Sequence, residues 1–324
     1  MGLLPLRVFA SVLPLALILA ITAPQDVDNR LSRGEWERVL GELRRQQADA
    51  SKASDRPGEV RAAVLLARAQ VTSNAYHLRD EQLADEASSH ALELAEQQGD
   101  PLLLADALHT RGRLLYWRAF QNKQWSAAQG LFERARSLSA QQRDARGEAD
   151  AWFYLGLIEQ QQNHLDAGDE RFVKGLALAR SAKDRLLESF FHRHLAASAD
   201  ERGRLDEAEK GFVESARLRL EQKACVLSPF AQITLAEFYE KAHRSPEKIP
   251  GLYKEAAATA ARCGSNRAAN LAHLALAKAA PTPTERASQG REALSFAKRF
   301  GDPTVLKETE AAVGPGDAGT PARP

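Results

Sequence analysis

Residues 151–182 read AWFYLGLIEQQQ, NHLDAGD and ERFVKGLALARSA in succession. The first and last of these segments carry apolar side chains at the three- and four-residue spacing of an amphipathic helix, and the polar segment between them is a turn. Gly156 and Gly168 stand where two helices approach closely, and Phe172 follows to fill the groove between them. The stretch therefore predicts a pair of packed helices.

The same arrangement returns along the chain at a regular spacing. The end of the second helix reads ALELAEQQGD at 91–100, ARSLSAQQRD at 135–144 and GLALARSAKD at 175–184, and weaker copies continue to 293–302. Successive copies are separated by 44, 40, 40, 41 and 37 residues. A period of this size indicates stacked helical pairs, and the number of copies predicts about six of them.

The composition agrees with a helical protein and excludes several classes. The 324 residues are rich in Ala, Leu, Arg, Glu and Gln, which favour helices, and poor in the residues that favour strands. A sheet-based enzyme fold is therefore not expected. The chain has 44 basic and 43 acidic residues, and a net charge of +1 gives no basic excess for a nucleic-acid partner.

The helix pairs resemble the tetratricopeptide repeat (TPR). That repeat has a large apolar residue, Leu and then Gly or Ala on its first helix, and Ala, an aromatic residue and Ala on its second. The two units that match it best do so at Trp152, Leu155, Gly156, Gly168, Phe172, Gly175, Leu195, Ala196, Ala208, Phe212 and Ser215.

The resemblance covers residues 57–302, and the long period is similar to that of bacterial multi-repeat sensors and of the arrays that precede caspase-like CHAT domains. It implies an all-α fold, a right-handed superhelical α-solenoid of about six helix pairs with N- and C-terminal capping helices.

The N-terminal segment predicts export. Residues 1–23 read as a signal peptide or an N-terminal anchor, because Arg7 precedes an apolar run from Val8 to Ile21. We therefore expect a periplasmic or secreted protein, either released or held at the inner membrane by residues 8–23. That segment is the only contact with a membrane that the sequence predicts.

The remaining flanks are predicted from their local patterns. Residues 24–56 are expected to hold a capping helix, preceded by a capping box that begins at Ser32, and a polar loop over 46–59. Residues 303–313 predict a capping helix, and the Gly- and Pro-rich residues 314–324 predict a disordered tail.

No motif for enzymatic chemistry is present in the sequence. It has no phosphate-binding loop, no nucleophile elbow and no zinc-binding HExxH. His192 and His194 are two residues apart, so on a helix their side chains point in different directions and a shared metal is not expected. We therefore predict a protein that is not an enzyme and needs no cofactor and no metal.

Candidate binding residues lie on the first helices, which line the concave face of a solenoid. Counting from the Leu/Gly pair of each unit places the following side chains there: Asp106, His109, Arg113, Tyr116, Trp117, Phe153, Tyr154, Leu157, Gln160, Arg193, His194, Asp200, Glu237 and Lys241. Aromatic and arginine side chains are typical of binding hot spots. For Trp117 and Trp125 two interpretations remain, the binding groove and the filling of an enlarged gap between repeats.

The two cysteines form a candidate disulfide. Cys225 precedes the first helix of one unit and Cys263 ends the second helix of the same unit. Since the two helices run antiparallel, the start of one lies beside the end of the other, as a disulfide requires. The alternative is a pair of buried thiols that pack as small hydrophobes.

Two functional hypotheses follow from the sequence. The first is a non-enzymatic, exported scaffold that binds a protein or peptide partner through its concave face. The alternative is the sensing or regulatory subunit of a split enzyme system, caspase-like or kinase, whose catalytic domain is on another chain.

Overall fold

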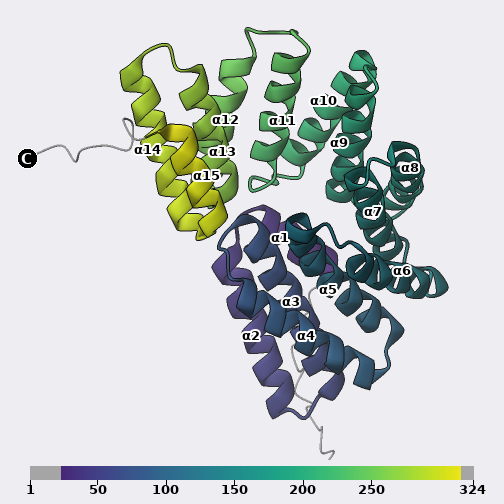
Figure 1. Cartoon of the computed structure of the whole chain (residues 1–324). Coiled ribbons are helices and arrows are strands. Elements are labelled where there is room, and N and C mark those ends of the chain that lie inside the picture. Colours follow the sequence, from purple (N-terminus) through teal and green to yellow (C-terminus); the bar gives the residue numbers. More distant parts are fainter. Residues whose placement is uncertain (1–22, 315–324) are drawn as a thin grey trace, which may run out of the picture.

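The computed structural model describes residues 23–314, and within them it contains fifteen α-helices and no strand. The prediction of an all-α solenoid is confirmed, with consecutive helices packed as pairs (Figure 1). The signal-peptide segment and nearly all of the predicted tail lie outside the described residues. The helices are α1 (Pro24–Ser32), α2 (Trp36–Lys52), α3 (Arg56–Tyr76), α4 (Glu81–Gln98), α5 (Pro101–Asn122), α6 (Ser126–Gln141), α7 (Ala145–Gln161), α8 (Leu165–Ser181), α9 (Arg185–Glu201), α10 (Leu205–Glu221), α11 (Ser228–Lys241), α12 (Ile249–Arg262), α13 (Asn266–Ala279), α14 (Pro283–Phe300) and α15 (Pro303–Val313).

The recurring sequence at the end of each unit is the turn between one helix pair and the next. Arg143 and Lys183, both with φ of 58°, have left-handed backbone and end their helices. The next residues begin the following helices, because the carboxylates of Asp144 and Asp184 accept hydrogen bonds from backbone N–H groups three residues on, at 3.1 and 2.9 Å. Glycine takes the left-handed position before α5 and α15. The sequence repeats because each turn needs a residue that tolerates this backbone, followed by an N-cap.

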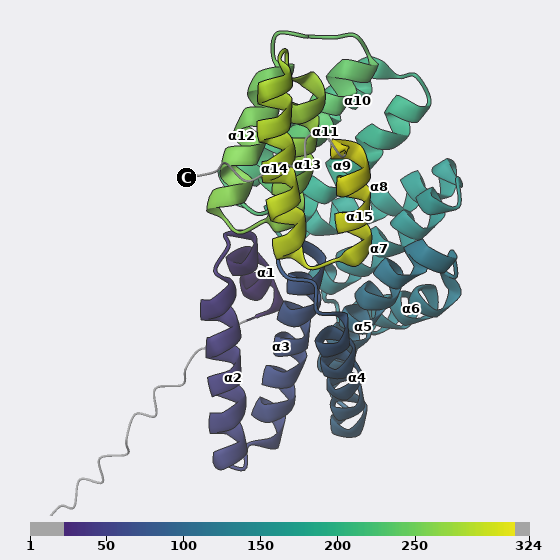
Figure 2. The ribbon, with the colours of Figure 1, turned by 60° about the vertical axis from the view of Figure 1, so that its left-hand side comes forward.

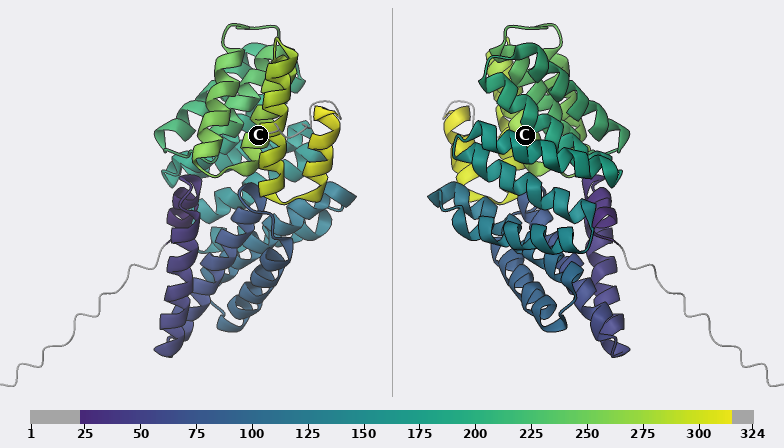
Figure 3. Two further views of the ribbon diagram at one scale, coloured as in Figure 1. Left: turned by 90° about the vertical axis from the view of Figure 1, so that its left-hand side faces the viewer. Right: turned by 90° about the vertical axis from the view of Figure 1, so that its right-hand side faces the viewer.

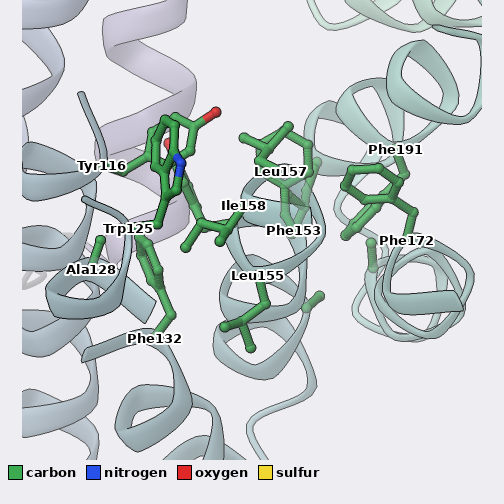
Figure 4. Close-up of a cluster of buried hydrophobic side chains, with 14 of the residues drawn as sticks. Tyr116, Trp125, Ala128, Phe132, Phe153, Leu155, Leu157, Ile158, Phe172 and Phe191 are labelled. Atoms are coloured by element: carbon green, nitrogen blue, oxygen red, sulfur yellow. The ribbon is translucent and has the colours of Figure 1, made fainter. Parts of the chain in front are cut away.

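The core of each pair depends on a close approach between small and aromatic residues. Phe132 and Phe172 are completely buried, and each ring lies against a glycine of the preceding helix. A Cβ atom added to Gly112 would lie 2.8 Å from the ring of Phe132, and one added to Gly156 would overlap the ring of Phe172. Figure 4 shows these rings on opposite sides of α7, the helix that carries Leu155. These contacts agree with the pattern that the TPR resemblance implies.

Two local predictions near the N-terminus are wrong. Residues 46–59 form no loop, since α2 continues to Lys52 and α3 begins at Arg56. The polar run consists largely of good helix formers, so its polarity reflects an exposed helical surface and not a break. Ser32 is not an N-cap but the last residue of α1, and its hydroxyl donates to the carbonyl of Asn29 at 2.7 Å.

The two ends of the solenoid touch each other. The Nδ1 atom of His77 lies 2.8 Å from the carbonyl oxygen of Gly264, and the side-chain amide of Asn266 donates to the carbonyl of His77 at 2.8 Å. The backbone N–H of Arg79 donates to the carbonyl of Phe300 at 2.8 Å. Figures 1 and 2 show the purple N-terminal helices beside the green and yellow C-terminal ones, and both views in Figure 3 agree. We call this set of contacts the seam.

None of the helices in residues 23–314 is long and apolar enough to cross a membrane.

Candidate functional site

The concave face of the solenoid encloses a cavity of about 350 Å³, which we call the central cavity. Its walls come mainly from α3, α5, α7, α9 and α11, which are the first helices of successive pairs. The short helix α1 adds Asp28 and Leu31, and α10 adds Arg219. Because α1 covers part of the concave face, the cavity is partly closed on that side.

Most of the predicted concave residues line the central cavity. They are Arg113, Tyr116, Trp117, Phe153, Tyr154, Leu157, Arg193 and His194. These residues come from α5, α7 and α9, and the spacing of the repeats predicted which face of each helix points inward. That they bind a partner stays a prediction.

Three other predicted residues support the cavity from behind. The imidazole of His109 is buried between the rings of Phe132 and Tyr154, with centroid separations of 5.4 and 5.3 Å. Asp106 is half-buried, and burial raises the pKa of its carboxyl to about 6. Gln160 donates to the carbonyl of His194 at 3.0 Å, so it is a structural support and not part of the lining.

The last three predicted residues, Asp200, Glu237 and Lys241, lie outside the central cavity. The ammonium of Lys241 donates to the carboxylate of Asp200 at 2.8 Å, so they form an ion pair between the C-terminal ends of α9 and α11. Glu237 lines a second cavity, of about 620 Å³, beside α13 and α14. The central cavity lies nearer the N-terminal ends of α9 and α11, because α1 and α2 close it there. The concave strip predicted from the repeats, by contrast, runs along the whole length of each first helix.

The aromatic residues of α5, and Trp125 just before α6, divide between the core and the cavity wall. Trp125 is 6% exposed and packs in the core with Tyr116, so it fills the gap between repeats. Trp117 lines the central cavity and stacks on Phe120, with ring centroids 5.7 Å apart. The aromatic residues that the sequence groups in this unit thus include one that fills the gap between repeats, Trp125, and one that lines the cavity, Trp117.

A buried ion network beside the cavity was not found by the sequence analysis. The guanidinium of Arg68 donates to both carboxylate oxygens of Asp28, at 2.9 and 2.7 Å, and to Asp150 at 2.7 Å. Arg146 also donates to Asp28, and its Nε lies 3.4 Å from the carboxylate of Asp184. Burial alone would raise the pKa of Asp28, but the charges of Arg68 and Arg146 outweigh it and lower this pKa to about 2.

Part of this network has a signal in the sequence. Arg146 and Asp150 are four residues apart, which places them on one face of a helix. The contact between Arg68 and Asp28 has no such signal, since it depends on α1 folding back into the concave face.

Arg193 is held in place by uncharged neighbours. Its Nη1 atom donates to Nε2 of His194 at 3.1 Å, and its Nη2 atom donates to the hydroxyl of Thr234 at 3.2 Å. Burial, together with the charges of Arg193 and Arg219, lowers the pKa of His194 well below its usual value. The neutral imidazole therefore donates from Nδ1 to the side-chain oxygen of Gln160, at 2.9 Å.

The cysteines are paired where the sequence placed them. Cys225 and Cys263 form a disulfide with Cα atoms 6.0 Å apart, between the start of α11 and the end of α12. The second end of this link is beside the seam, since Cys263 directly precedes Gly264, whose carbonyl oxygen lies 2.8 Å from Nδ1 of His77. The oxidation state of the two thiols in the protein remains a prediction.

The described residues hold no group of three or more His, Cys, Asp or Glu side chains placed to bind a metal ion. His192 points toward Arg180, with 3.4 Å between Nε2 and Nη2, whereas His194 faces Gln160. The two histidines therefore point to different neighbours.

Comparisons with known proteins concern the fold alone. No family model matches the sequence, and no curated protein matches it. Among solved structures, the chain is similar to a Rap protein complexed with competence and sporulation factor, at 15% identity and a TM-score of 0.57, over 90% of this chain and 95% of that one. It is also similar to a STAND protein with a tetratricopeptide repeat sensor from Pyrococcus horikoshii, at 16% identity and a TM-score of 0.51, over 88% of this chain and 43% of that one. BtubC from P. vanneervenii matches at 17% identity and a TM-score of 0.47, over 72% of this chain and 91% of that one. The chain thus has the fold of a TPR-type helical solenoid.

Proposed function

We propose that this chain is a non-enzymatic, exported scaffold that binds a protein or peptide partner through its concave face. The observation that carries the proposal is the lining of the central cavity, where Trp117, Arg113 and Tyr154 stand together on the inner face of adjacent repeats. Side chains of this kind dominate binding energies at protein interfaces. The Rap protein that shares the fold was solved with competence and sporulation factor bound, which supports a partner of this class.

The test is capture of a partner by the full chain from a periplasmic extract, with two variants run in parallel. Trp117→Ala removes a cavity aromatic, and Val173→Ser changes a side chain on α8 that is 57% exposed. A partner retained by wild type and by Val173→Ser but lost with Trp117→Ala supports the proposal. A set of captured proteins that is the same for all three chains argues against the concave face as the binding surface.

Export is proposed from the sequence of residues 1–25. Fusing residues 1–30 to a reporter that is active only outside the cytoplasm should give activity, and deleting Leu15–Leu19 should abolish it because the apolar run becomes too short for the export machinery. A reporter that remains inactive with the intact segment contradicts export.

The alternative is a sensing or regulatory subunit of a split caspase-like or kinase system. One finding favours it: the STAND protein that shares the fold carries its tetratricopeptide repeats as a sensor, and this chain spans 43% of that chain. A captured partner with a catalytic domain whose activity changes when this chain binds would distinguish it from a scaffold.

A further inference from the structure

The central cavity has the size and the walls of a small-molecule site. About 350 Å³ is at the lower end of the range for pockets that enclose a single small ligand. Much of the wall is aromatic or aliphatic, with Tyr76, Phe153, Phe190 and Phe230 among its members. The short helix α1 covers part of this space.

The wall of the central cavity carries more basic than acidic side chains. Five arginines and three aspartates line the central cavity. The aspartates, Asp28, Asp150 and Asp184, are all engaged by Arg68 and Arg146 in the ion network.

The other three arginines, Arg113, Arg193 and Arg219, form no ion pair within 4.0 Å in the part of the chain that the structure describes. The wall therefore carries more positive than negative charge, and none of these three guanidinium groups has a carboxylate within 4.0 Å in the described residues.

Arg219 is the most deeply buried of the three arginines. Its residue is 2% exposed, and its Nε and Nη1 atoms donate to the hydroxyl of Ser189 at 3.2 Å and the carbonyl of Leu227 at 2.9 Å. Its guanidinium carbon lies 4.8 Å from the ring centre of Phe190. Burial and the charge of Arg193 lower the pKa of Arg219 to about 9, so it is still cationic at neutral pH.

Arg193 and Arg113 also lack a carboxylate partner, but they are less deeply buried than Arg219. Arg193 is half-buried, and its hydrogen bonds go to Thr234 and His194, which are both neutral. Arg113 is 7% exposed, lies over the ring of Tyr154 at 5.9 Å, and its buried Nε has no hydrogen-bond partner in the described residues. A buried guanidinium without a counterion is unfavourable, and an anion bound beside it removes the penalty.

We propose that the central cavity binds a small organic anion, whose carboxylate or phosphate group is held by Arg219 and Arg193 and whose apolar body packs against the aromatic wall. The planar guanidinium fork suits both anionic groups. The inference does not rest on the protein partner proposed above, because it is carried by Arg219 and Arg193 and not by the residues that carry that proposal.

The test uses the full chain and a matched series of probes. The anions are octanoate, 4-phenylbutyrate and 4-phenylbutyl phosphate, and the controls are 4-phenylbutanol and 4-phenylbutylamine, which keep the apolar body and lose or reverse the charge. Binding is measured by calorimetry and by the rise in melting temperature. We expect saturable binding and stabilisation by at least one anion, and none by the alcohol or the amine. The carboxylate and phosphate arms identify the preferred group.

Variants then locate the site. Arg219→Gln and Arg193→Gln should each weaken anion binding at least about tenfold, because each removes a charge-assisted hydrogen bond. Arg217→Gln is the matched control, since Arg217 lies on the same helix but pairs with Glu214 and Glu221 at the surface, and it should bind as wild type does.

Several outcomes would overturn the proposal. These are no binding by any anion at its highest soluble concentration, equal binding of the alcohol, and unchanged affinity in both Arg219→Gln and Arg193→Gln. If Arg219→Gln does not fold, the half-buried Arg193→Gln decides the result alone.

Discussion

The carboxylate of Asp28 and the guanidinium of Arg68 form a bidentate ion pair across forty residues of sequence, with donor–acceptor distances of 2.9 and 2.7 Å. The pair fixes the short helix α1 inside the concave face, where Arg146 from α7 engages the same carboxylate. The ion pair adds to the apolar contacts of Val27 and Leu31, which are fully buried, because an isolated helix of nine residues is not stable by itself. Asp28 thus contributes to the form of the central cavity from outside the repeats.

Asp28→Asn should lower the free energy of unfolding by about 3 kcal/mol at pH 7, since it leaves Arg68 and Arg146 short of a counterion. The measurement is chemical denaturation at equilibrium. Asp26→Asn, an exposed change on the same helix, is the control and should be neutral. Equal stability of the two variants would contradict the anchoring role of Asp28.

The contribution of Asp28 should also depend on pH. Its pKa is lowered from 3.8 to about 2 in the folded chain, so the folded state binds its proton less readily than the unfolded state does. The stabilisation is therefore fully present above about pH 4 and is lost as the pH falls toward about 2. The difference in unfolding free energy between wild type and Asp28→Asn, measured from pH 7 down to the acid transition, should shrink over that window. A difference that stays constant there would mean that Asp28 is not ionically paired.

Trp117→Ala and Trp125→Ala should affect different properties, the first partner binding and the second stability. Trp117 lines the central cavity, so its truncation should weaken partner binding by about 1–2 kcal/mol and leave the helical content unchanged. Trp125 is buried in the core, and its truncation should lower the free energy of unfolding by about 3–5 kcal/mol. Circular dichroism with denaturation, and affinity for the captured partner, separate the two effects. Unfolding of Trp117→Ala would place Trp117 in the core instead.

Phe212→Ala should lower the free energy of unfolding by about 3–5 kcal/mol, because the ring of Phe212 is 4% exposed and packs against Phe238 in the core of its repeat. Val213→Ala is the control, since Val213 is 43% exposed on the same helix. A loss below about 1 kcal/mol for Phe212→Ala would show that the repeat closes over the gap.

Protein purified from the exported fraction should contain no free thiol, because Cys225 and Cys263 are paired. Alkylation under native, non-reducing conditions followed by mass spectrometry measures this directly. Reduction should lower the free energy of unfolding by about 4 kcal/mol, the chain-entropy value for a link that spans 38 residues. Two alkylated cysteines in the native sample would reject the bond.

The sequence predicted the repeats well and the contacts between distant segments poorly, for a physical reason. Gly156, Phe172 and the turn aspartates leave a local signal because each acts within one or two helices. The position of α1, by contrast, depends on a fold already formed by other segments. The predicted concave strip includes Phe153, which lines the central cavity, and Lys241, which does not, because α1 and α2, and not the repeat, determine where the cavity lies.

The seam has a consequence for how the chain unfolds. In an open solenoid each repeat contacts only its neighbours, so the terminal repeats can fray while the middle survives. Here His77 and Arg79 join the N-terminal repeat to Gly264 and Phe300 near the other end, so each terminal repeat has two neighbours. Loss of either end removes contacts from the other, so we expect the array to unfold as a single cooperative unit in which amide hydrogen exchange at the two ends is coupled.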